Sequence, residues 1–139
     1  MDSSAMYVLP EFGPIVGVLD ALLSELNVGL LIYHLEEPTD SESLKLVYFN
    51  REAARSTGLD MDTRLGMRIL DAFPPLAESD APKTFHEVVT TQRSRRIEVP
   101  YAEVGEQVHY SVRAFPMPAH CVGVLFERAG EPGEAAGPA

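Results

Sequence analysis

The stretch 46–75 constrains the fold more than any other, because it carries start and stop signals for several short elements in succession. Residues 47–49, Val-Tyr-Phe, are β-branched or aromatic and favour a strand. Asn50 follows where a helix would begin, since its side-chain carbonyl can accept a backbone N–H that the first turn leaves unpaired. Gly58 can close that helix, because glycine adopts the left-handed C-cap conformation without a Cβ clash. The stretch therefore predicts a strand that leads directly into a short capped helix.

The second half of the stretch repeats this punctuation. Asp60, Asp62 and Thr63 form another helix-start signal, and Gly66 is a second hinge. The proline pair 74–75 then stops the region. We expect several short helical segments here rather than one continuous helix.

Strand-like runs lie on both sides of this stretch. Residues 30–33 form a short apolar strand, an acidic turn-rich loop spans 36–43, and a second strand begins near Leu44. Two strands joined this closely are most simply antiparallel neighbours.

Beyond the prolines, a longer helix is expected to begin at Ser79 or Asp80. The apolar period then changes to two over 97–101 and 108–115, and a last strand spans 121–126. Three strands with short connections form an antiparallel meander. The pattern as a whole predicts an α+β domain with a five-stranded antiparallel sheet, short helices over one face, and the helices inserted after the second strand.

An amphipathic helix is predicted before the first strand. Its apolar residues recur at spacings of three and four, which places four of them on one stripe: Ile15, Leu19, Leu22 and Leu26. This stripe either packs on the domain's own sheet or mediates homodimerisation, because Ile and Leu at such spacing serve both uses.

The chain divides into four parts by composition and period. They are an irregular lead-in (1–13), the amphipathic helix (14–27), the sheet-bearing domain (28–129) and a tail rich in Gly, Pro, Ala and Glu (130–139). We expect the tail to be disordered or a linker.

The punctuated region resembles the PAS sensory-domain family, in which a strand ends in Asn, a short helix ends in a Thr-Gly pair, and a Gly precedes a Leu-Asp-Phe-Pro-like turn. The matching residues are Asn50, Ala53, Ala54, Thr57, Gly58, Leu65, Gly66, Leu70, Asp71, Phe73 and Pro74. The likeness extends over roughly 26–128 in the order of elements. It departs at 127–129, Glu-Arg-Ala, where many PAS domains have Asp-Ile-Thr leading into an output helix.

The resemblance implies a sensory or interaction domain of a bacterial-type signalling protein, such as a histidine kinase or a transcriptional regulator, with no catalysis of its own. PAS domains often carry a helix before the first strand, so the expected partners are a second copy through that helix, a small-molecule ligand, and an output domain or partner protein. A purely structural homodimerisation module without ligand is the alternative within the family.

Charge and cysteine content exclude several partners. Against 11 Lys and Arg stand 21 Asp and Glu, which gives a net charge of −10 and argues against binding to nucleic acid or to an anionic membrane surface. Cys121 is the single cysteine, so an internal disulfide is excluded. The apolar region 15–33 contains Asp20 and Glu25, which would be costly inside a bilayer, and the chain begins without a basic signal. We expect a cytoplasmic protein.

Cofactor chemistry is not expected. The family resemblance implies that a flavin or coumaroyl chromophore would need a cysteine in the helical segment, and residues 66–73 contain none. Haem ligated by His86 on the long helix is the alternative that the resemblance leaves open. The other histidines, His34, His109 and His120, have no ligand-like spacing, so no metal site is predicted.

The candidate ligand pocket lies between the sheet and the helices. Its predicted residues are Tyr48, Phe73, Phe85, His86, Val89, Tyr110, Val112 and Arg113. Most of these residues could simply fill the core, which is the default for apolar residues at core periodicity. Arg113, with Ser111 on the same face of its strand, could meet a ligand carboxylate, although such an arginine is more often solvated or paired with a glutamate.

An enzyme with a cone-shaped cavity is the alternative from another class, and it would need an inward-facing carboxylate. Asp71 and Glu98 are the candidates, and the pattern places both on the surface. A non-catalytic domain is therefore predicted.

Overall fold

The structure is a computed structural model that describes residues 13–102 and 107–129, with side chains from residue 17 onwards. Most of the predicted lead-in and all of the predicted tail at 130–139 lie outside the described residues. In the part of the chain that is described, no helix has both the length and the apolar character needed to cross a membrane.

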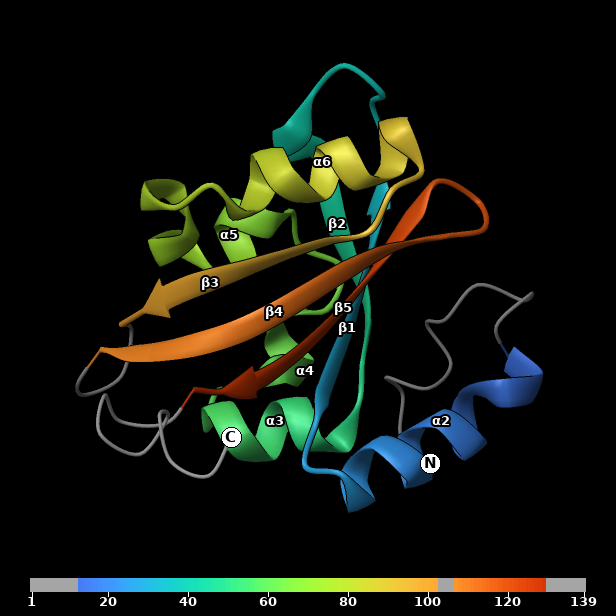
Figure 1. Cartoon of the computed structure of the whole chain (residues 1–139), viewed down its shortest axis with the longest axis vertical. Helices are drawn as coiled ribbons and strands as arrows, with labels where there is room; N and C mark the ends of the chain where they lie inside the picture. The colour runs from blue at the N-terminus through green and yellow to red at the C-terminus, as the bar shows by residue number, and fades with distance from the viewer. Residues whose placement is uncertain (1–12, 103–106, 130–139) are drawn as a thin grey trace.

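One antiparallel sheet of five strands organises the fold, as predicted. The strands lie in the order β2-β1-β5-β4-β3 (Figure 1). Their bounds are β1 (Gly29–Leu35), β2 (Leu44–Phe49), β3 (Arg95–Tyr101), β4 (Val108–Met117) and β5 (Cys121–Arg128). The last three strands form the expected meander, and β5 joins it to the first strand pair.

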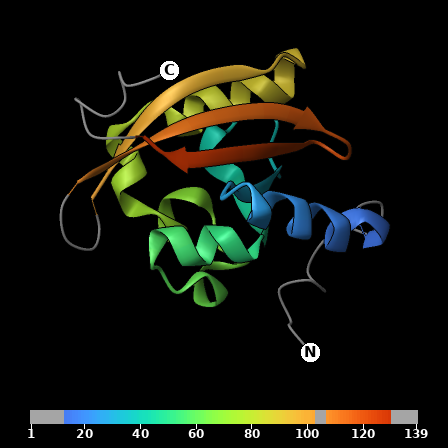
Figure 2. The ribbon, with the colours of Figure 1, turned by 60° about the horizontal axis from the view of Figure 1, so that its bottom comes forward.

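Short helices follow β2 and precede β3. Their bounds are α3 (Arg51–Thr57), α4 (Met61–Arg64), α5 (Ile69–Ala72), η3 (Pro74–Glu78) and α6 (Ala81–Thr91), with a further turn, η2 (Ser41–Ser43), before β2. Figure 2 shows α3 to α6 on one side of the sheet. They enclose the main core against the inner face of the sheet.

The predicted helix punctuation is confirmed around α3. Asn50 is the N-cap, and its side-chain oxygen accepts the Ala53 N–H at 2.9 Å. Gly58 is the C-cap with φ 72°, and its N–H donates to the Ala54 carbonyl at 3.0 Å. Asp60 before α4 and Asp80 before α6 are also N-caps, but neither side chain forms a capping hydrogen bond. At the start of α6, Ser79 Oγ accepts the Ala81 N–H.

A bulge in β2 corrects the prediction for Tyr48. Tyr33 pairs with Leu46 and Ile32 pairs with Tyr48, so Val47 has no partner in the register with β1. The extra residue reverses the alternation of side chains beyond it. Val47 and Tyr48 therefore both pack in a second cluster with Ile32, on the face of the sheet opposite the main core.

The N-terminal helix α2 (Gly13–Glu25) lies against the lower end of the sheet and α3 (Figure 1). Leu23 packs on the second cluster, and Asp20 accepts hydrogen bonds from the backbone and side chain of Arg51. The predicted single stripe is split: Leu19 is half-buried, whereas Leu22 and Leu26 are 58% and 66% exposed. Val18, which was not part of the predicted stripe, is 60% exposed, and the side chain of Ile15 lies outside the described part.

Two glycines give a matched test of the backbone. Gly58→Ala should destabilise the protein by about 1 kcal/mol, because an L-residue with φ near +72° is strained even where nothing lies near the new Cβ. Gly17→Ala should instead stabilise by roughly 0.5–1 kcal/mol, because Gly17 is inside α2 and its Cβ would also meet no atom within 4 Å. Urea unfolding of both variants measures the two signs, and the same sign at both positions would contradict this account.

Candidate ligand pocket

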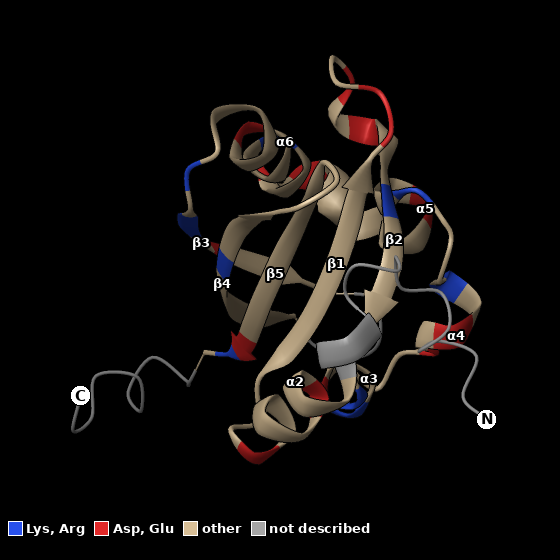
Figure 3. Cartoon of the chain, turned by 90° about the vertical axis from the view of Figure 1, so that its right-hand side faces the viewer, with Lys and Arg blue, Asp and Glu red and all other residues tan. Residues whose placement is uncertain are grey.

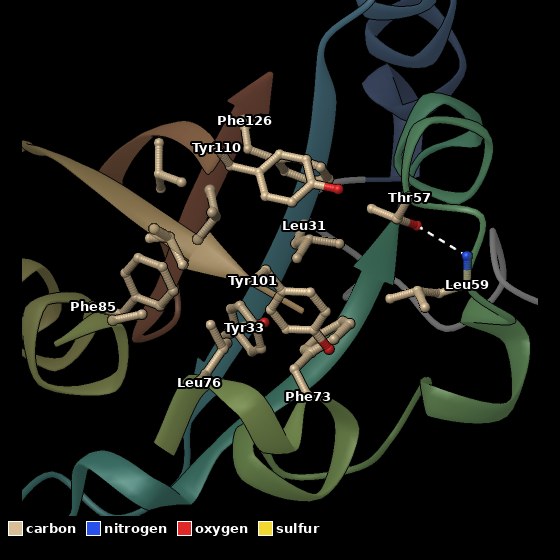
Figure 4. Close-up of a pocket in the computed structure, with 14 residues that line it drawn as sticks. Leu31, Tyr33, Thr57, Leu59, Phe73, Leu76, Phe85, Tyr101, Tyr110 and Phe126 are labelled. Atoms are coloured by element: carbon tan, nitrogen blue, oxygen red, sulfur yellow. Dashed lines mark hydrogen bonds between the residues drawn. The ribbon is translucent and has the colours of Figure 1, made fainter. Parts of the chain in front are cut away.

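A cavity of about 70 Å³ lies between the inner face of the sheet and its helical cover. Figure 4 shows side chains from the sheet and from the cover pointing toward the same space. The lining residues are Leu31, Tyr33, Thr57, Leu59, Phe73, Leu76, Ala81, Phe85, Val99, Tyr101, Tyr110, Val112, Val124 and Phe126. They come from every strand except β2, from the end of α3 and the loop after it, and from the segment from Phe73 to α6.

Paired aromatic rings hold the walls of this cavity. Tyr33 stacks on Phe85 with ring centroids 5.8 Å apart, and Tyr110 meets Phe126 edge to face at 5.4 Å. Phe126 packs across the backbone of Gly29, where a Cβ would collide with its ring. Such packing fixes the ring positions, because a well-packed core tolerates few alternative rotamers.

Hydroxyl groups supply the polar chemistry of the cavity. Tyr33, Tyr101, Tyr110 and Thr57 are the lining residues that carry one, and the lining includes no charged side chain and no histidine. Thr57 Oγ donates to the Ala53 carbonyl at 2.7 Å and accepts the Leu59 N–H at 3.2 Å, as the dashed line in Figure 4 shows. An ion placed here would lose its hydration without gaining a charged partner, so the cavity suits neutral molecules.

Two phenols of the cavity, those of Tyr33 and Tyr110, have a raised pKa and are neutral. Burial raises the pKa of Tyr33, and the nearby phenol of Tyr101 raises it further. Burial also raises the pKa of Tyr110, partly offset by the positive charge of Arg128. These groups therefore offer hydrogen bonds without charge.

The raised pKa of Tyr33 predicts a loss of stability in alkali. Above pH values of about 10, the Tyr33 phenol ionises in the unfolded chain but stays protonated in the folded one. The unfolded state then binds one proton fewer, so the free energy of unfolding falls by about 1.4 kcal/mol per pH unit as the pH rises. Urea unfolding followed by circular dichroism at several alkaline pH values measures this slope.

Tyr33→Phe should remove most of that slope. Tyr110→Phe is the control and should leave most of it, because Arg128 offsets part of the effect of burial there. Equal alkaline slopes for the original protein and Tyr33→Phe would show that Tyr33 does not resist ionisation.

Comparison with known proteins gives structural matches alone. No family model matches the sequence, and no curated protein matches it. Solved structures match at low identity: a domain of an HTR-like protein from Haloarcula marismortui ATCC 43049 gives a TM-score of 0.57 at 15% identity, over 75% of this chain and 99% of that one. The photoactive yellow protein domain of the sensor histidine kinase Ppr from Rhodospirillum centenum gives 0.61 at 16% identity, over 83% and 97%.

A third match has the same architecture. It is a domain of the sensory box sensor histidine kinase/response regulator from Geobacter sulfurreducens, with a TM-score of 0.61 at 14% identity over 80% of this chain and 91% of that one. The chain has the PAS fold. The fold confirms the resemblance that was drawn from residues 46–75.

Within the PAS fold, the predicted pocket residues separate into three groups. Phe73, Phe85, Tyr110 and Val112 line the cavity. Val89 is buried in the same core cluster but does not line it. Tyr48, His86 and Arg113 lie elsewhere.

His86 points away from the cavity. Its Nε2 lies 2.7 Å from the Pro38 carbonyl oxygen, so the imidazole joins α6 to the loop before β2. Successive residues of a helix point about 100° apart, which is why Phe85 faces the cavity and its neighbour His86 does not. A cavity of about 70 Å³ without a histidine in its wall does not fit haem ligated by His86. In the described residues no cluster of three metal-ligating side chains occurs.

Three charged residues lie on the surface, one predicted for the ligand pocket and two considered as catalytic carboxylates. Arg113 is exposed on the outer face of β4, opposite the cavity. Asp71 and Glu98 are also exposed and line no part of the cavity.

Several residues that line the cavity were not among the predicted pocket residues. Tyr33 and Tyr101 carry hydroxyls into the cavity wall, and Thr57 and Leu59 approach it from the helical cover. Alternation along the strand at 30–33 places Leu31 and Tyr33 on one face, so that signal was present in the sequence. The approach of Thr57 and Leu59 depends on the chain reversal at Gly58, which no periodicity encodes.

Proposed function

We propose that this chain is a sensory PAS domain of a signalling protein, without catalysis of its own, that responds to a small neutral ligand held between the sheet and the helices. The observation that carries this proposal is the cavity, whose walls are apolar and aromatic and whose polar groups are neutral hydroxyls. Two matched structures are domains of sensor histidine kinases, which supports a role in signal transduction. The output domain would belong to a longer chain or to a separate partner.

The size of the cavity suggests how a ligand would be sensed. A dry cavity of about 150 Å³ accommodates benzene, so 70 Å³ accommodates roughly three heavy atoms without rearrangement. Any larger ligand must displace part of the wall. Continuous ladders join β1 to β5, β5 to β4 and β4 to β3, whereas α4 and α5 have four residues each, so the helical cover is the part expected to move.

Such a ligand would act by favouring one arrangement of the cover over another. A ligand that binds two conformations equally shifts neither. Here the ligand would touch sheet residues such as Val112 and cover residues such as Leu59 at the same time. Movement of the cover would then change its contacts with α2 and the rest of the signalling protein.

Paired neutral and charged probes test this proposal. We expect phenol and propan-2-ol to raise the thermal unfolding temperature in a concentration-dependent manner, and benzoate and propionate to have no such effect. An absorption spectrum of the purified protein adds an independent test of the cofactor prediction. A haem or flavin band, or equal stabilisation by the charged probes, would contradict a neutral-ligand site.

A second candidate function is homodimerisation through α2. Val18, Leu22 and Leu26 are exposed at intervals of four residues, while Leu23, about 100° around the helix from Leu22, packs on the second cluster of the sheet. An apolar face of this kind is self-complementary across a two-fold axis, so the proposed occupant is α2 of a second copy. Light scattering should give a dimer that Leu22→Glu converts to monomer, whereas Thr90→Glu, which adds the same charge to an exposed position of α6, leaves it intact. A monomer for the original chain would exclude this candidate.

A further inference from the structure

Charged side chains form two rows of opposite sign on the outer face of the sheet. Arg96 of β3 lies directly opposite Arg113 of β4, which in turn lies opposite Leu125 of β5. The adjacent row has Ser111 between two carboxylates, with Glu98 opposite it on β3 and Glu127 opposite it on β5. Figure 3 shows the blue band on β4 and the red band at the end of β5 on this side of the molecule.

This surface is hollowed. A depression of about 220 Å³ is lined by Arg96, Ser111, Arg113, Leu125 and Glu127, together with Val28 just before β1. Val112 and Phe126 also line it, although both are buried in the main core on the inner face. It lies on the opposite face of the sheet from the side chains of the aromatic cavity. It is therefore a separate candidate site, and it does not depend on the proposed sensory ligand.

Within the part of the chain that the structure describes, the side chains of the two arginines have no partner, although they face each other across neighbouring strands. Like charges directly opposite on neighbouring strands repel each other. Other basic side chains, such as Lys45, Arg51 and Arg95, form ion pairs with carboxylates. Among the described residues, the side chains of Arg96 and Arg113 form no hydrogen bond or ion pair, and both are exposed. A carboxylate bound between the two guanidinium groups would relieve their repulsion and accept charge-assisted hydrogen bonds.

The neighbouring glutamates restrict what such a ligand can be. Glu127 is diagonal to Arg113 across the β4–β5 pair, and diagonal neighbours lie about 7–8 Å apart. A ligand with a carboxylate at the arginines would therefore place any adjacent group close to Glu127. A second negative charge would be repelled there, whereas an ammonium would be attracted.

We propose that this hollow binds a free α-amino acid with a small apolar side chain. The carboxylate lies between Arg96 and Arg113 and accepts a hydrogen bond from the Ser111 hydroxyl. The ammonium faces Glu127, and the side chain packs on Val28 and Leu125. The two rows of opposite charge thus match the two charges of one zwitterion.

Three related probes test each part of this assignment. L-valine carries both charges, 3-methylbutanoate lacks the ammonium and isobutylamine lacks the carboxylate. Backbone-amide NMR titrations of the full chain should show saturable shifts in β3, β4 and β5 with L-valine. Both analogues should bind at least about tenfold more weakly, since each loses a charge-assisted contact.

Variants locate the site. Arg96→Gln, Arg113→Gln and Glu127→Gln should each weaken L-valine binding by about tenfold or more, and their spectra should remain those of a folded protein because all three side chains are exposed. Lys83→Gln, at an exposed position on α6, and Tyr33→Phe, in the aromatic cavity, should leave L-valine binding unchanged.

Three outcomes would overturn the proposal. They are an absence of saturable shifts up to roughly 10 mM L-valine, equal affinity for 3-methylbutanoate, and an unchanged affinity in Arg113→Gln. A mass by light scattering that falls from dimer to monomer in Arg113→Gln, without a response to L-valine, would instead assign the face to contact between two copies.

Discussion

Asn50→Ala is expected to destabilise the protein by about 3 kcal/mol or more. The Asn50 side chain is 1% exposed, and its oxygen accepts the N–H groups of both Leu30 and Ala53 at 2.9 Å. Its amide nitrogen donates to the Val28 carbonyl at 3.1 Å. Alanine would leave the Leu30 N–H and the Val28 carbonyl without these partners, whereas the Ala53 N–H would keep its bond to the backbone carbonyl of residue 50 at 3.2 Å. Each unsatisfied buried group costs roughly 1–3 kcal/mol, and the lost helix cap adds about 1 kcal/mol. Equilibrium unfolding in urea measures the loss.

Asn50→Asp is the matched control. A carboxylate keeps the oxygen that accepts from Leu30 and Ala53 but lacks the N–H that donates to Val28. Its stability should therefore lie between those of the original protein and Asn50→Ala. A loss of less than about 1 kcal/mol in Asn50→Ala would show that this residue acts only as an ordinary helix cap.

Phe85→Ala is expected to cost about 3–5 kcal/mol, the range for removing a buried aromatic ring. Phe85 is 3% exposed, stacks on Tyr33 and lines the existing cavity. Removing the ring would enlarge an apolar space that is already present. Benzene should then bind the variant and restore part of its unfolding temperature, since apolar cavities of sufficient size take up such ligands.

Phe115→Ala is the control for this result. Phe115 is partly buried on the outer face of the sheet, where it packs with the second cluster rather than at the cavity. Its removal should cost less, and benzene should not restore its stability. Equal restoration of both variants, or none in Phe85→Ala, would contradict the position assigned to the cavity.

The start and end of the short helix α3 were the part of the fold that the sequence predicted best. Asn50 and Gly58 act through contacts within a few residues, so their roles as N-cap and C-cap could be inferred directly. The wider role of Asn50 could not, because its bonds to Val28 and Leu30 join segments 20 or more residues apart. The cap residue also fastens the end of β2 to the start of β1.

The errors in the predicted pocket have a common cause. Simple alternation from the buried Leu44 and Leu46 would place Tyr48 inward, but the pairing of β2 with β1 leaves Val47 as an extra residue and turns Tyr48 outward. His86 was placed by its helix alone, although its orientation is set by the Pro38 carbonyl of a distant loop. Both depend on partners that a periodic pattern does not identify.

The most direct test of a ligand site inside this PAS fold is a methyl NMR titration with phenol, on the original protein and on Val112→Phe. Val112 lines the cavity, and a larger ring at this position would fill the space. We predict saturable shifts of the Leu31 and Val124 methyl groups in the original protein and their loss in Val112→Phe, provided that the variant remains folded. Absence of shifts in the original protein, or equal shifts in a folded Val112→Phe, would contradict the account.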